Sequence, residues 1–364
     1  MKRVTYIISG IDFSIHFKWL VEYLHGEGLQ LSFILLNSSK PALCSYFDDI
    51  GIKNDWIPFH GKYSFIKAFP LVMKLLKNNR PDIIHTHLWE ASIVGLLAGK
   101  LLGIKKRIYT RHHGAIHHLY FPRAVWYDRW INRLASDIVV LSSAHASLLK
   151  KEGVAKDKLR LIPHGFDLDY FKNVSANRIQ KVRNKYQIPS DCKIIGTIAR
   201  FTHWKGIQYI IPAIEAISNK ERIFWVLANA TGDYHREIKA GLSKLPTASY
   251  CEIEFEQDIA ALYQTFDLFV HTPIHPAAES FGQVYVEALL CGIPSVFTLS
   301  GILSDIEVNN ENIRIVSFKD SKSIQAAINE LLLVERPNKP IINSHGFSIQ
   351  SMISKLSFLY GERD

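Results

Sequence analysis

The segment Ala278-Glu-Ser-Phe-Gly-Gln-Val-Tyr-Val-Glu-Ala-Leu-Leu-Cys-Gly-Ile-Pro294 has the form of a loop that runs into a helix. Gly282 allows the backbone to approach a ligand closely, and apolar spacing predicts a helix over 284–291 that ends at Gly292 and Pro294. The unpaired N–H groups and the positive dipole at the start of such a helix suit a phosphate group. The segment therefore indicates an α/β protein in which a helix start binds an anion.

Two glutamates of this segment are candidates for binding hydroxyl groups. Glu287 lies about one turn into the predicted helix, where its carboxylate is placed to accept hydrogen bonds from the vicinal hydroxyls of a ribose. Glu279 precedes the helix and is placed to bind the hydroxyls of a second sugar. Glutamates near a helix start are also common as capping or surface residues, and the spacing alone leaves that alternative open.

Short β-type runs alternate with helical segments on both sides of this segment. In the first half we expect strands at 4–9, 29–36, 82–87, 107–110 and 137–141, and helices at 13–25, 70–78, 91–102 and 144–152. In the second half we expect strands at 193–198, 223–228, 268–272 and 295–298, and helices at 207–218, 258–265 and 284–291. Pro212 predicts a kink or a later start for its helix. The alternation predicts two doubly wound parallel sheets.

The expected domains are residues 1–168 and residues 169–346, with a polar linker at 172–185 and an amphipathic helix at 347–360. Ligands of doubly wound sheets bind beyond the carboxyl ends of the strands. Two such domains in one chain imply a cleft between them that shares one ligand.

Arg200 and Lys205 form a second constellation, directly after the predicted strand at 193–198 and before Gly206. A pyrophosphate leaving group gains negative charge as its bond to a sugar breaks, and two fixed cations stabilise that charge without a metal ion. Without further pattern, a solvent-facing Arg and Lys in a loop would be the default interpretation.

The segments around these residues resemble a known family. Glu279 and Glu287 have seven residues between them inside Glu-Ser-Phe-Gly-x4-Glu-Ala-x3-Gly-x-Pro, which is similar to the E-x7-E signature of glycosyltransferase family 4. Three further segments match: Gly196-Thr-Ile-Ala-Arg200 with Lys205-Gly206, Ile162-Pro-His-Gly165-x-Asp167-x3-Phe171, and Asp267-Leu-Phe-Val-x-Thr-Pro273. The resemblance extends over nearly the whole chain and is densest from 164 to 294.

The resemblance implies an α/β protein of GT-B fold, with two Rossmann-like doubly wound parallel-sheet domains facing a central cleft. It implies a retaining, metal-independent transfer from a nucleoside-diphosphate sugar to an acceptor hydroxyl, with no cofactor beyond that co-substrate. The final segment, 347–364, is expected to pack back on the first domain. The residues expected on the donor side are Gly10, Arg200, Lys205, Glu279, Phe281, Gly282, Gln283 and Glu287.

The N-terminal half has two histidine groups at predicted strand ends, His85-Thr-His87 and Thr110-Arg-His112-His113. Such clusters invite a zinc interpretation, but no partner completes a ligand set of familiar spacing, so we expect no metal site. The resemblance places His112 near the reacting sugar, with His113 as the alternative if the register differs by one residue, and so adds His112 to Arg200, Lys205 and Glu279 as the expected catalytic residues. His87, His113 and Asp12 are the expected acceptor-side residues, and buried structural histidines remain the alternative.

The sequence also departs from the family pattern. Only Gly10 follows the first predicted strand, where many members have a Gly-Gly pair, and His164 replaces the usual Asn. The run 229–233, Asn-Ala-Thr-Gly-Asp, stands where Gly-x-Gly is frequent, which leaves recognition of the base undefined. Asp167-Leu-Asp169 resembles a metal-binding DxD, but we expect it to form a turn.

Composition limits the remaining classes. The 364 residues carry a formal net charge of +9, and residues 1–170 hold 23 basic and 14 acidic residues, so the whole excess lies there. A one-sided basic surface favours an anionic partner or, alternatively, only adds solubility. Arginines interleave with aromatics at 118–123 and 126–133, which suits an interfacial membrane helix or a packed aromatic helix. No nucleic-acid module is recognisable.

The four cysteines have neither CxxC spacing nor clustering, so no disulfide framework is expected. No apolar run reaches the ~20 residues that span a bilayer. We expect a cytoplasmic glycosyltransferase, peripheral on the inner face of the membrane, that acts on a saccharide or lipid-linked acceptor in cell-surface polysaccharide, lipopolysaccharide or glycolipid synthesis. The rivals are a nucleotide-sugar epimerase or pyridoxal-phosphate phosphorylase of similar architecture, and a non-catalytic nucleotide-sugar-binding protein.

Overall fold

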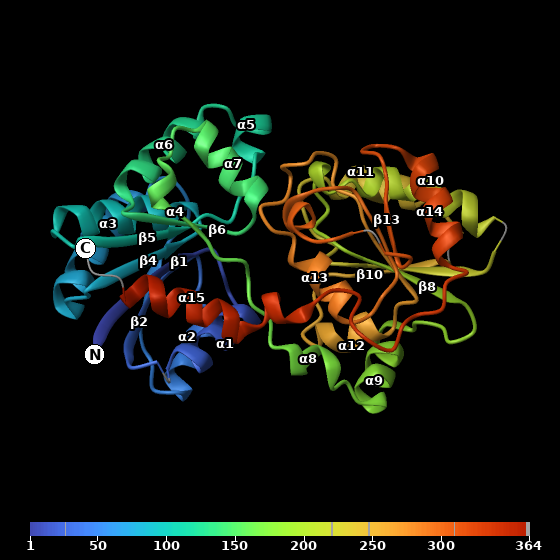
Figure 1. The fold of residues 1–364 in the computed structure, drawn as a ribbon, viewed down its shortest axis with the longest axis horizontal. Helices are drawn as coiled ribbons and strands as arrows, with labels where there is room; N and C mark the ends of the chain where they lie inside the picture. The colour runs from blue at the N-terminus through green and yellow to red at the C-terminus, as the bar shows by residue number, and fades with distance from the viewer. Residues whose placement is uncertain (26, 220, 247, 309, 362–364) are drawn as a thin grey trace. The chain divides into compact units, whose positions relative to one another are not determined.

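The computed structural model describes residues 1–25, 27–219, 221–246, 248–308 and 310–361. The chain divides into two compact units (Figure 1). Unit 1 comprises Met1–Phe166 and Phe347–Asp364, and unit 2 comprises Asp167–Gly346. Each unit is built around one parallel sheet, and the two are described separately below.

Unit 1 contains a seven-stranded sheet in the order β3-β2-β1-β4-β5-β6-β7, and all neighbouring strands run parallel. Its central strands are buried on both faces, as expected when helices cover a parallel sheet. The strands are β1 (Lys2–Ser9), β2 (Leu29–Asn37), β3 (Lys53–Pro58), β4 (Ile83–His87), β5 (Lys106–Thr110), β6 (Asp137–Val140) and β7 (Leu159–Leu161).

The helices of unit 1 connect successive strands, and one of them, α4, approaches the sheet very closely. A Cβ at Gly95 would lie 2.7 Å from the Ile7 side chain, and one at Gly99 would lie 2.3 Å from Ile84, so larger residues would push the helix away. The helices are α1 (Ile15–Leu24), α2 (Ala42–Asp49), α3 (Ser64–Asn79), α4 (Trp89–Leu101), α5 (Ile116–Tyr120), α6 (Ala124–Leu134), α7 (Ser143–Lys151), a short 3₁₀ turn at Lys156–Lys158, and α15 (Ile349–Gly361).

The last helix, α15, returns from the far end of the chain to pack on α1 in unit 1. Lys2 Nζ donates to the Tyr360 carbonyl at 2.7 Å, which ties the two ends of the described chain together. The Tyr360 hydroxyl is buried, hydrogen bonded to the Tyr6 hydroxyl, and 2.6 Å from His85 Nδ1. A satisfied polar cluster inside the core makes α15 an integral part of unit 1.

Unit 2 contains a six-stranded sheet in the order β10-β9-β8-β11-β12-β13, again with parallel neighbours. The strands are β8 (Lys193–Ile198), β9 (Ile223–Ala228), β10 (Tyr250–Ile253), β11 (Leu268–His271), β12 (Ser295–Phe297) and β13 (Ile313–Ile315). The helices are α8 (Leu168–Lys172), α9 (Ala176–Tyr186), α10 (Ile207–Ser218), α11 (His235–Leu242), α12 (Ile259–Gln264), α13 (Gln283–Leu290) and α14 (Ser321–Leu331), with 3₁₀ turns at His203–Lys205, Gly301–Asp305 and Ser344–Phe347.

Both sheets reverse their strand order at one point. In unit 1 the chain moves outward from β1 through β2 to β3 and then returns to place β4 on the other side of β1. In unit 2 it moves from β8 through β9 to β10 and returns to place β11 beside β8. The loops that leave the carboxyl ends of the two central strands diverge at such a switch point, and this leaves room for a ligand.

The predicted α/β class with two parallel sheets is confirmed, but several local predictions are wrong. The expected linker at 172–185 is largely the helix α9, which Ser175 caps by accepting from the Arg178 N–H at 3.4 Å. Helix α3 contains Pro70 rather than beginning there, and α10 begins at Ile207 with Pro212 inside it, so the later start is also wrong.

The sequence patterns also missed several short or half-exposed elements. These are α2, β3, β7, α8, α11, β10, β13 and α14. The edge strand β3 shows neither the continuous apolar run of a central strand nor a clean alternation, and β13, Ile-Arg-Ile, is too short for its alternation to stand out. No described helix has the length and apolar character needed to cross a membrane. The four cysteines are free thiols.

Candidate functional site

The strongest cluster of chemically active side chains in unit 2 lies at the carboxyl ends of β8 and β11. Lys205 ends the 3₁₀ turn that follows β8, and its Nζ lies 2.5 Å from Glu279 Oε1. His271, the last residue of β11, places Nε2 3.0 Å from the same oxygen. The side chains of Lys205 and Glu279 are only 17% and 11% exposed. The switch point therefore brings together the two candidate residues Lys205 and Glu279 and adds His271.

The protonation states of this cluster follow from its geometry. Burial alone would raise the pKa of Glu279, but the charge of Lys205 and the hydrogen bond from His271 together hold that pKa below its usual range. Burial lowers the pKa of His271 despite its bond to Glu279. Because His271 Nδ1 is buried and has no partner among the described residues, the neutral ring carries its proton on Nε2 and donates it to the carboxylate. Glu279 is thus an ionised acceptor held by two donors.

A glycine is required beside Lys205 because two backbone segments touch there. Gly206 has φ +77°, and a Cβ at that position would lie 1.9 Å from the Thr272 carbonyl oxygen. The turn that carries Lys205 therefore presses directly against the end of β11. Close backbone packing fixes the position of the ammonium group relative to the strand end.

Helix α13 begins at Gln283 with its backbone donors available. Gly282 adopts φ +80°, and no side chain caps the helix start. The N–H groups of Gly282, Gln283 and Val284 have no backbone acceptor within the described part of the chain. Phe281 is 1% exposed, and its carbonyl accepts from Ile302 N–H at 2.8 Å. Any ligand contact of Phe281 must therefore use its backbone, whereas the helix start is open to an anion.

Glu287 lies one turn into α13 and points to α12. Its Oε2 accepts from the Tyr263 hydroxyl at 2.8 Å. Burial raises the pKa of Glu287 to about 7, and the hydrogen bond from Tyr263 offsets part of that rise. Near neutral pH this carboxyl group is poised between the ionised form, which only accepts hydrogen bonds, and the neutral form, which also donates one.

Arg200, two residues beyond β8, is exposed. Within the described ranges its guanidinium has neither an ion-pair partner nor a side-chain hydrogen bond. The neighbouring run 229–233 keeps a glycine-like geometry although it lacks the Gly-x-Gly pattern. Asn229 has φ +59°, and a Cβ at Gly232 would lie 2.2 Å from the Phe201 carbonyl oxygen. Asn tolerates the left-handed region, so it replaces the first glycine without loss of the turn.

In unit 1 the predicted histidines His87 and His112 meet. His87 Nδ1 lies 2.9 Å from His112 Nε2, at the carboxyl ends of β4 and β5. Burial lowers the pKa of His112 to about 3 and that of His87 well below its usual value. Leu88, which directly follows His87, is held at φ +70°, a strained conformation for leucine. Two neutral, hydrogen-bonded imidazoles therefore occupy the end of the sheet where the sequence predicted the acceptor side.

His113 faces a different, largely buried group of charges. Its Nε2 lies 3.2 Å from Asp128 Oδ1, and His117 Nδ1 lies 2.7 Å from Asp128 Oδ2. Arg111, fully buried, donates to Asp128 at 3.3 Å and to Glu152 at 2.7 Å. His113, His117 and Asp128 could hold a cation, since one atom of each lies within 4.8 Å of the others. The Asp128 carboxylate, however, already receives a charge-assisted bond from Arg111.

The two predicted residues of the first loop have different environments. Gly10 has φ +66°, and a Cβ there would meet open space, so the backbone at Gly10 is accessible. Asp12 Oδ1 accepts from Ala42 N–H at 3.0 Å and so fixes the start of α2. The structure gives Asp12 a role inside the loop, and its contact with an acceptor stays a prediction.

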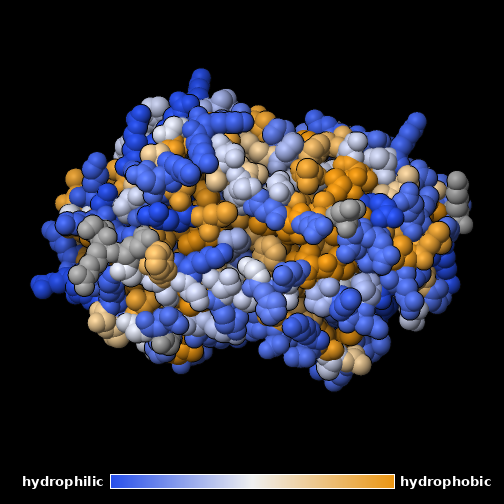
Figure 2. Space-filling view, viewed as in Figure 1, coloured by the Kyte–Doolittle hydropathy of each residue, from blue (hydrophilic) through white to orange (hydrophobic). Residues whose placement is uncertain are grey.

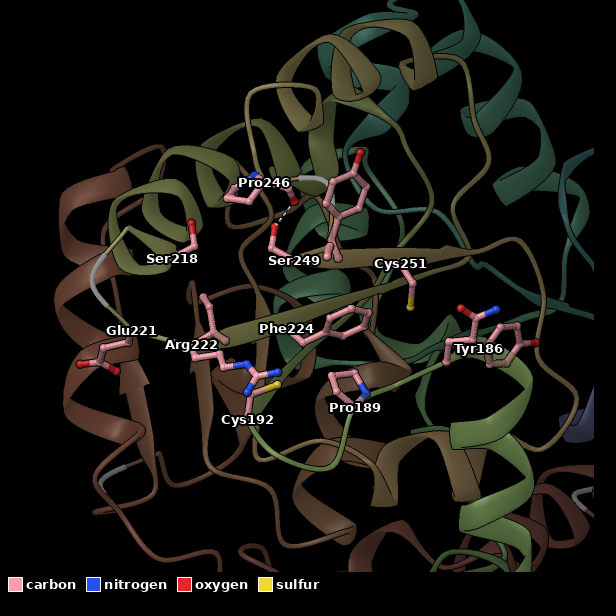
Figure 3. A pocket seen from close by; sticks show the side chains of 14 residues that line it. Tyr186, Pro189, Cys192, Ser218, Glu221, Arg222, Phe224, Pro246, Ser249 and Cys251 are labelled. Atoms are coloured by element: carbon pink, nitrogen blue, oxygen red, sulfur yellow. Dashed lines mark hydrogen bonds between the residues drawn. The ribbon is translucent and has the colours of Figure 1, made fainter.

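A large hollow in unit 2 lies at the opposite end of the sheet (Figure 3). It has a volume of about 590 Å³ and is lined by Cys192, Arg222, Phe224 and Cys251, among others. Cys192 directly precedes β8, and Phe224 and Cys251 lie near the starts of β9 and β10. Ligands of doubly wound sheets bind beyond the carboxyl ends, so this hollow is not the predicted site.

Several residues of the clusters were missed by sequence reasoning, among them His271, Tyr263 and Asp128. His271 filled an unassigned position in the segment before the glutamate signature, and Tyr263 stood in a plain helical pattern. Asp128 is the single acidic residue in an aromatic and basic stretch, 111–136, a signal that could have marked it as buried. Partners of this kind come from other elements, so spacing along one segment does not reveal them.

Known proteins place these two units in one class, enzymes with the two-sheet GT-B architecture. Residues 14–170 match the family described as Glycosyltransferase Family 4, and residues 178–344 match the family described as Glycosyl transferases group 1. The chain belongs to these glycosyltransferase families, as the sequence predicted.

The curated relatives include the 2-deoxystreptamine glucosyltransferase of Streptomyces kanamyceticus, which is 24% identical over 67% of this chain and 64% of its own length. The chain thus covers less than two thirds of that relative. Among solved structures, Anabaena HepE in complex with UDP and glucose has a TM-score of 0.83 at 19% identity, with 100% of both chains covered.

The GT-B architecture is not exclusive to transferases. The UDP-GlcNAc 2-epimerase of Methanocaldococcus jannaschii has a TM-score of 0.65 at 14% identity, covering 98% of this chain and 99% of its own. At such identities the likeness shows the fold alone. The family matches, and the side chains at the carboxyl ends of the strands, carry the functional argument.

Proposed function

We propose that this protein is a retaining glycosyltransferase that moves a hexosyl group from a nucleoside-diphosphate sugar to an acceptor hydroxyl. The observation that carries the proposal is the Lys205–Glu279–His271 cluster beside the open start of α13, at the switch point of unit 2. A diphosphate needs cations and N–H donors, and a sugar needs an ionised acceptor for its hydroxyls. The cation Lys205 and the ionised acceptor Glu279 meet at the strand ends of unit 2, and the N–H donors lie at the start of α13.

Different residues of unit 2 bind different parts of the donor. Arg200, Lys205 and the N–H groups at the start of α13 bind the diphosphate, and Glu287 accepts from the ribose hydroxyls. Glu279 binds the sugar. The cations stabilise the charge that the departing diphosphate gains, so we propose that no metal ion is required. The Anabaena structure with UDP and glucose supports a nucleoside diphosphate as the leaving group.

In the reaction itself, the acceptor oxygen forms a bond to the anomeric carbon on the face from which the diphosphate departs. The bond between that carbon and the phosphate oxygen breaks, and the acceptor proton passes to the departing phosphate oxygen. This route retains the configuration and needs no separate protein base. Positioning and electrostatics supply most of the barrier reduction.

We assign the acceptor to unit 1, with His112 and His87 at its strand ends and the basic excess of residues 1–170 attracting an anionic group. An acceptor that is lipid-linked or part of a cell-surface polysaccharide or lipopolysaccharide fits that charge. The proposed place of work is the cytoplasmic face of the membrane.

The first experiment is a thermal-shift titration with UDP, GDP, ADP and CDP in EDTA, using the wild type, Lys205→Ala and Glu287→Ala. A nucleotide at about 100 times its Kd stabilises the folded state by roughly 2.7 kcal/mol. We expect a shift with one nucleotide, smaller in both variants and unchanged in Lys244→Ala, which removes an exposed lysine elsewhere in unit 2.

The result separates the rivals. A shift with no nucleotide would contradict the proposal, and a shift that requires Mg²⁺ would contradict metal independence. A protein that consumes the matching UDP-sugar without an acceptor and changes the sugar's configuration would be an epimerase. Transfer of a labelled hexose to an acceptor, detected by mass spectrometry, would establish the transferase.

A further inference from the structure

Unit 1 exposes a group of large apolar side chains at the start of α3, at the end of α5 and in α6, and both α3 and α6 pack against α4. Tyr63 precedes α3 and is 77% exposed, and Ile66 in its first turn is also 77% exposed. At the end of α5 and in α6, Phe121, Trp126 and Tyr127 are 55%, 65% and 44% exposed. A contiguous apolar patch that a folded protein leaves in water usually marks a binding surface.

Aromatic rings in contact connect the start of α3 with the start of α6 through Trp89 of α4. The Phe65 ring of α3 lies 6.4 Å from the Trp89 ring of α4, and Trp89 lies 5.7 Å from Tyr127 of α6. Trp126 follows at 5.1 Å from Tyr127. The starts of α3 and α6, which carry most of the exposed side chains, are therefore linked through Trp89 of α4.

The outward face of α6 is unusual for a surface helix. Trp126, Arg129 and Arg133 recur at helical spacing and are exposed, while Ile131 and Asn132 on the opposite face are buried. An ordinary solvated face would carry short polar or mixed-charge residues. Here arginine and tryptophan alternate, and each arginine stem adds apolar contact area.

The charge of this surface has one sign. No acidic residue occurs from 56 to 81, and the only one from 111 to 136 is Asp128, whose side chain is 0% exposed. Lys62, Lys67, Arg123 and Arg129 are exposed, and none has an ion-pair partner within the described ranges. We call the surface formed by these four cations with Tyr63, Ile66, Phe121, Trp126 and Tyr127 the cationic aromatic face. Figure 2 shows strongly hydrophilic residues beside hydrophobic ones over α5 and α6.

We propose that the cationic aromatic face binds the surface of a membrane that contains anionic lipids. Lysine and arginine pair with headgroup phosphates, while tryptophan and tyrosine prefer the headgroup level and Ile66 and Phe121 reach the acyl boundary. Aliphatic side chains such as Ile66 offer no stacking platform to a nucleic-acid base, so the mixture favours a bilayer. The binding itself does not depend on the proposed function. Only its role does, because membrane binding would bring the enzyme to a lipid-linked acceptor.

The test is flotation of the full-length wild type with vesicles of phosphatidylcholine alone and of phosphatidylcholine with phosphatidylglycerol. We expect binding to the anionic vesicles only, weakening as salt is raised. Each cation near an anionic surface contributes roughly fivefold to the binding constant. Arg123→Ala with Arg129→Ala should therefore weaken binding by about 25-fold, and Trp126→Ala should weaken it independently of salt.

Matched variants control for charge and aromatic content. Lys181→Ala with Lys244→Ala removes two exposed cations from unit 2, and Phe358→Ala removes an aromatic ring that is 72% exposed on α15. Both should bind vesicles as the wild type does. Equal thermal unfolding midpoints would show that every variant is folded.

Three results would overturn the inference: absence of binding, equal binding to neutral vesicles, or full binding by the variants of the cationic aromatic face. Binding of single-stranded RNA in place of vesicles would assign the face to nucleic acid instead. Nucleotide shifts measured on the same preparations separate the two claims. A protein that binds UDP but no vesicles contradicts only this inference, and one that binds vesicles but no nucleotide contradicts only the proposed function.

Discussion

The ammonium nitrogen of Lys205 lies 2.5 Å from a carboxylate oxygen of Glu279, so two groups assigned to different parts of the donor neutralise each other. Both side chains are largely shielded from water, which makes the pair stronger than an exposed one and makes loss of either partner costly. Under the proposed function, a bound diphosphate gives Lys205 a second anionic partner while Glu279 keeps the donor His271. The pair thus holds both groups in place for the donor.

Replacement of the ammonium group should lower turnover. In Lys205→Met the departing diphosphate loses one fixed cation, and we expect kcat to fall on the order of 10²-fold, as when one oxyanion donor is removed. Steady-state transfer or donor-hydrolysis kinetics measure the effect, with Lys244→Met as the control. Turnover within about twofold of the wild type would show that Lys205 does not serve the leaving group.

The ion pair itself predicts non-additive stability. Glu279→Gln leaves the Lys205 charge with less compensation, and Lys205→Met leaves Glu279 with only His271. We therefore expect the double variant to be less destabilised than the sum of the single ones, with a coupling energy of about 0.5–3 kcal/mol. Urea unfolding of the wild type, the two single variants and the double variant gives the four free energies of unfolding from which the coupling energy is calculated. Strict additivity would mean that the two charges are held apart in solution.

The fold was largely predictable because parallel sheets leave a strong pattern. Buried strands such as β1 and β9 are continuous apolar runs, and their helices follow at regular distance. The prediction of a linker at 172–185 was wrong, because most of this segment is the helix α9. Its polar residues cover the solvent face of α9, and only Val182 is buried, so the segment has almost no apolar stripe to reveal a helix.

The candidate residues could be named from the sequence where one segment carries them. Glu279, Gly282 and Glu287 lie within ten residues, and the resemblance of that segment to the family signature, not the spacing alone, marked them as candidates. Their partners His271 and Tyr263 come from β11 and α12, and tertiary packing sets those contacts. Sequence spacing also could not separate His112 from His113, whereas the structure turns one to His87 and the other to Asp128.

Glu287 predicts a pH dependence of stability. Its pKa is raised to about 7 in the folded protein, against about 4.3 for an ordinary glutamate. The folded state therefore holds the proton to higher pH than the unfolded state does. The contribution of this group to stability is complete below about pH 4 and is lost as pH rises through 7.

Glu287→Gln should remove the fall in stability that deprotonation of Glu287 causes as pH rises. We expect the variant to gain stability over the wild type between pH 5 and pH 8, by up to about 3 kcal/mol, and to show no gain at pH 4. Unfolding midpoints at pH 4, 6 and 8 measure the difference. A constant offset at all three pH values would show that Glu287 titrates normally. Loss of UDP affinity in the same variant would separately test its role at the ribose.

His87 and His112 predict a specific pair of tautomers. His87 Nε2 is buried with no partner within the described residues, and a buried N–H without an acceptor costs more than a buried lone pair. The proton of His87 is therefore on Nδ1 and is donated to His112 Nε2, which leaves the proton of His112 on Nδ1. Because burial lowers both pKa values, the rings stay neutral from pH 8 down to pH 5.

Nitrogen-15 NMR of labelled histidines at pH 6 should show two neutral Nδ1–H rings, with His87→Gln and His112→Gln to assign them. A proton on His87 Nε2 would mean that a group in the adjoining cavity of about 20 Å³ accepts it, and a charged ring would contradict the hydrogen-bonded neutral pair.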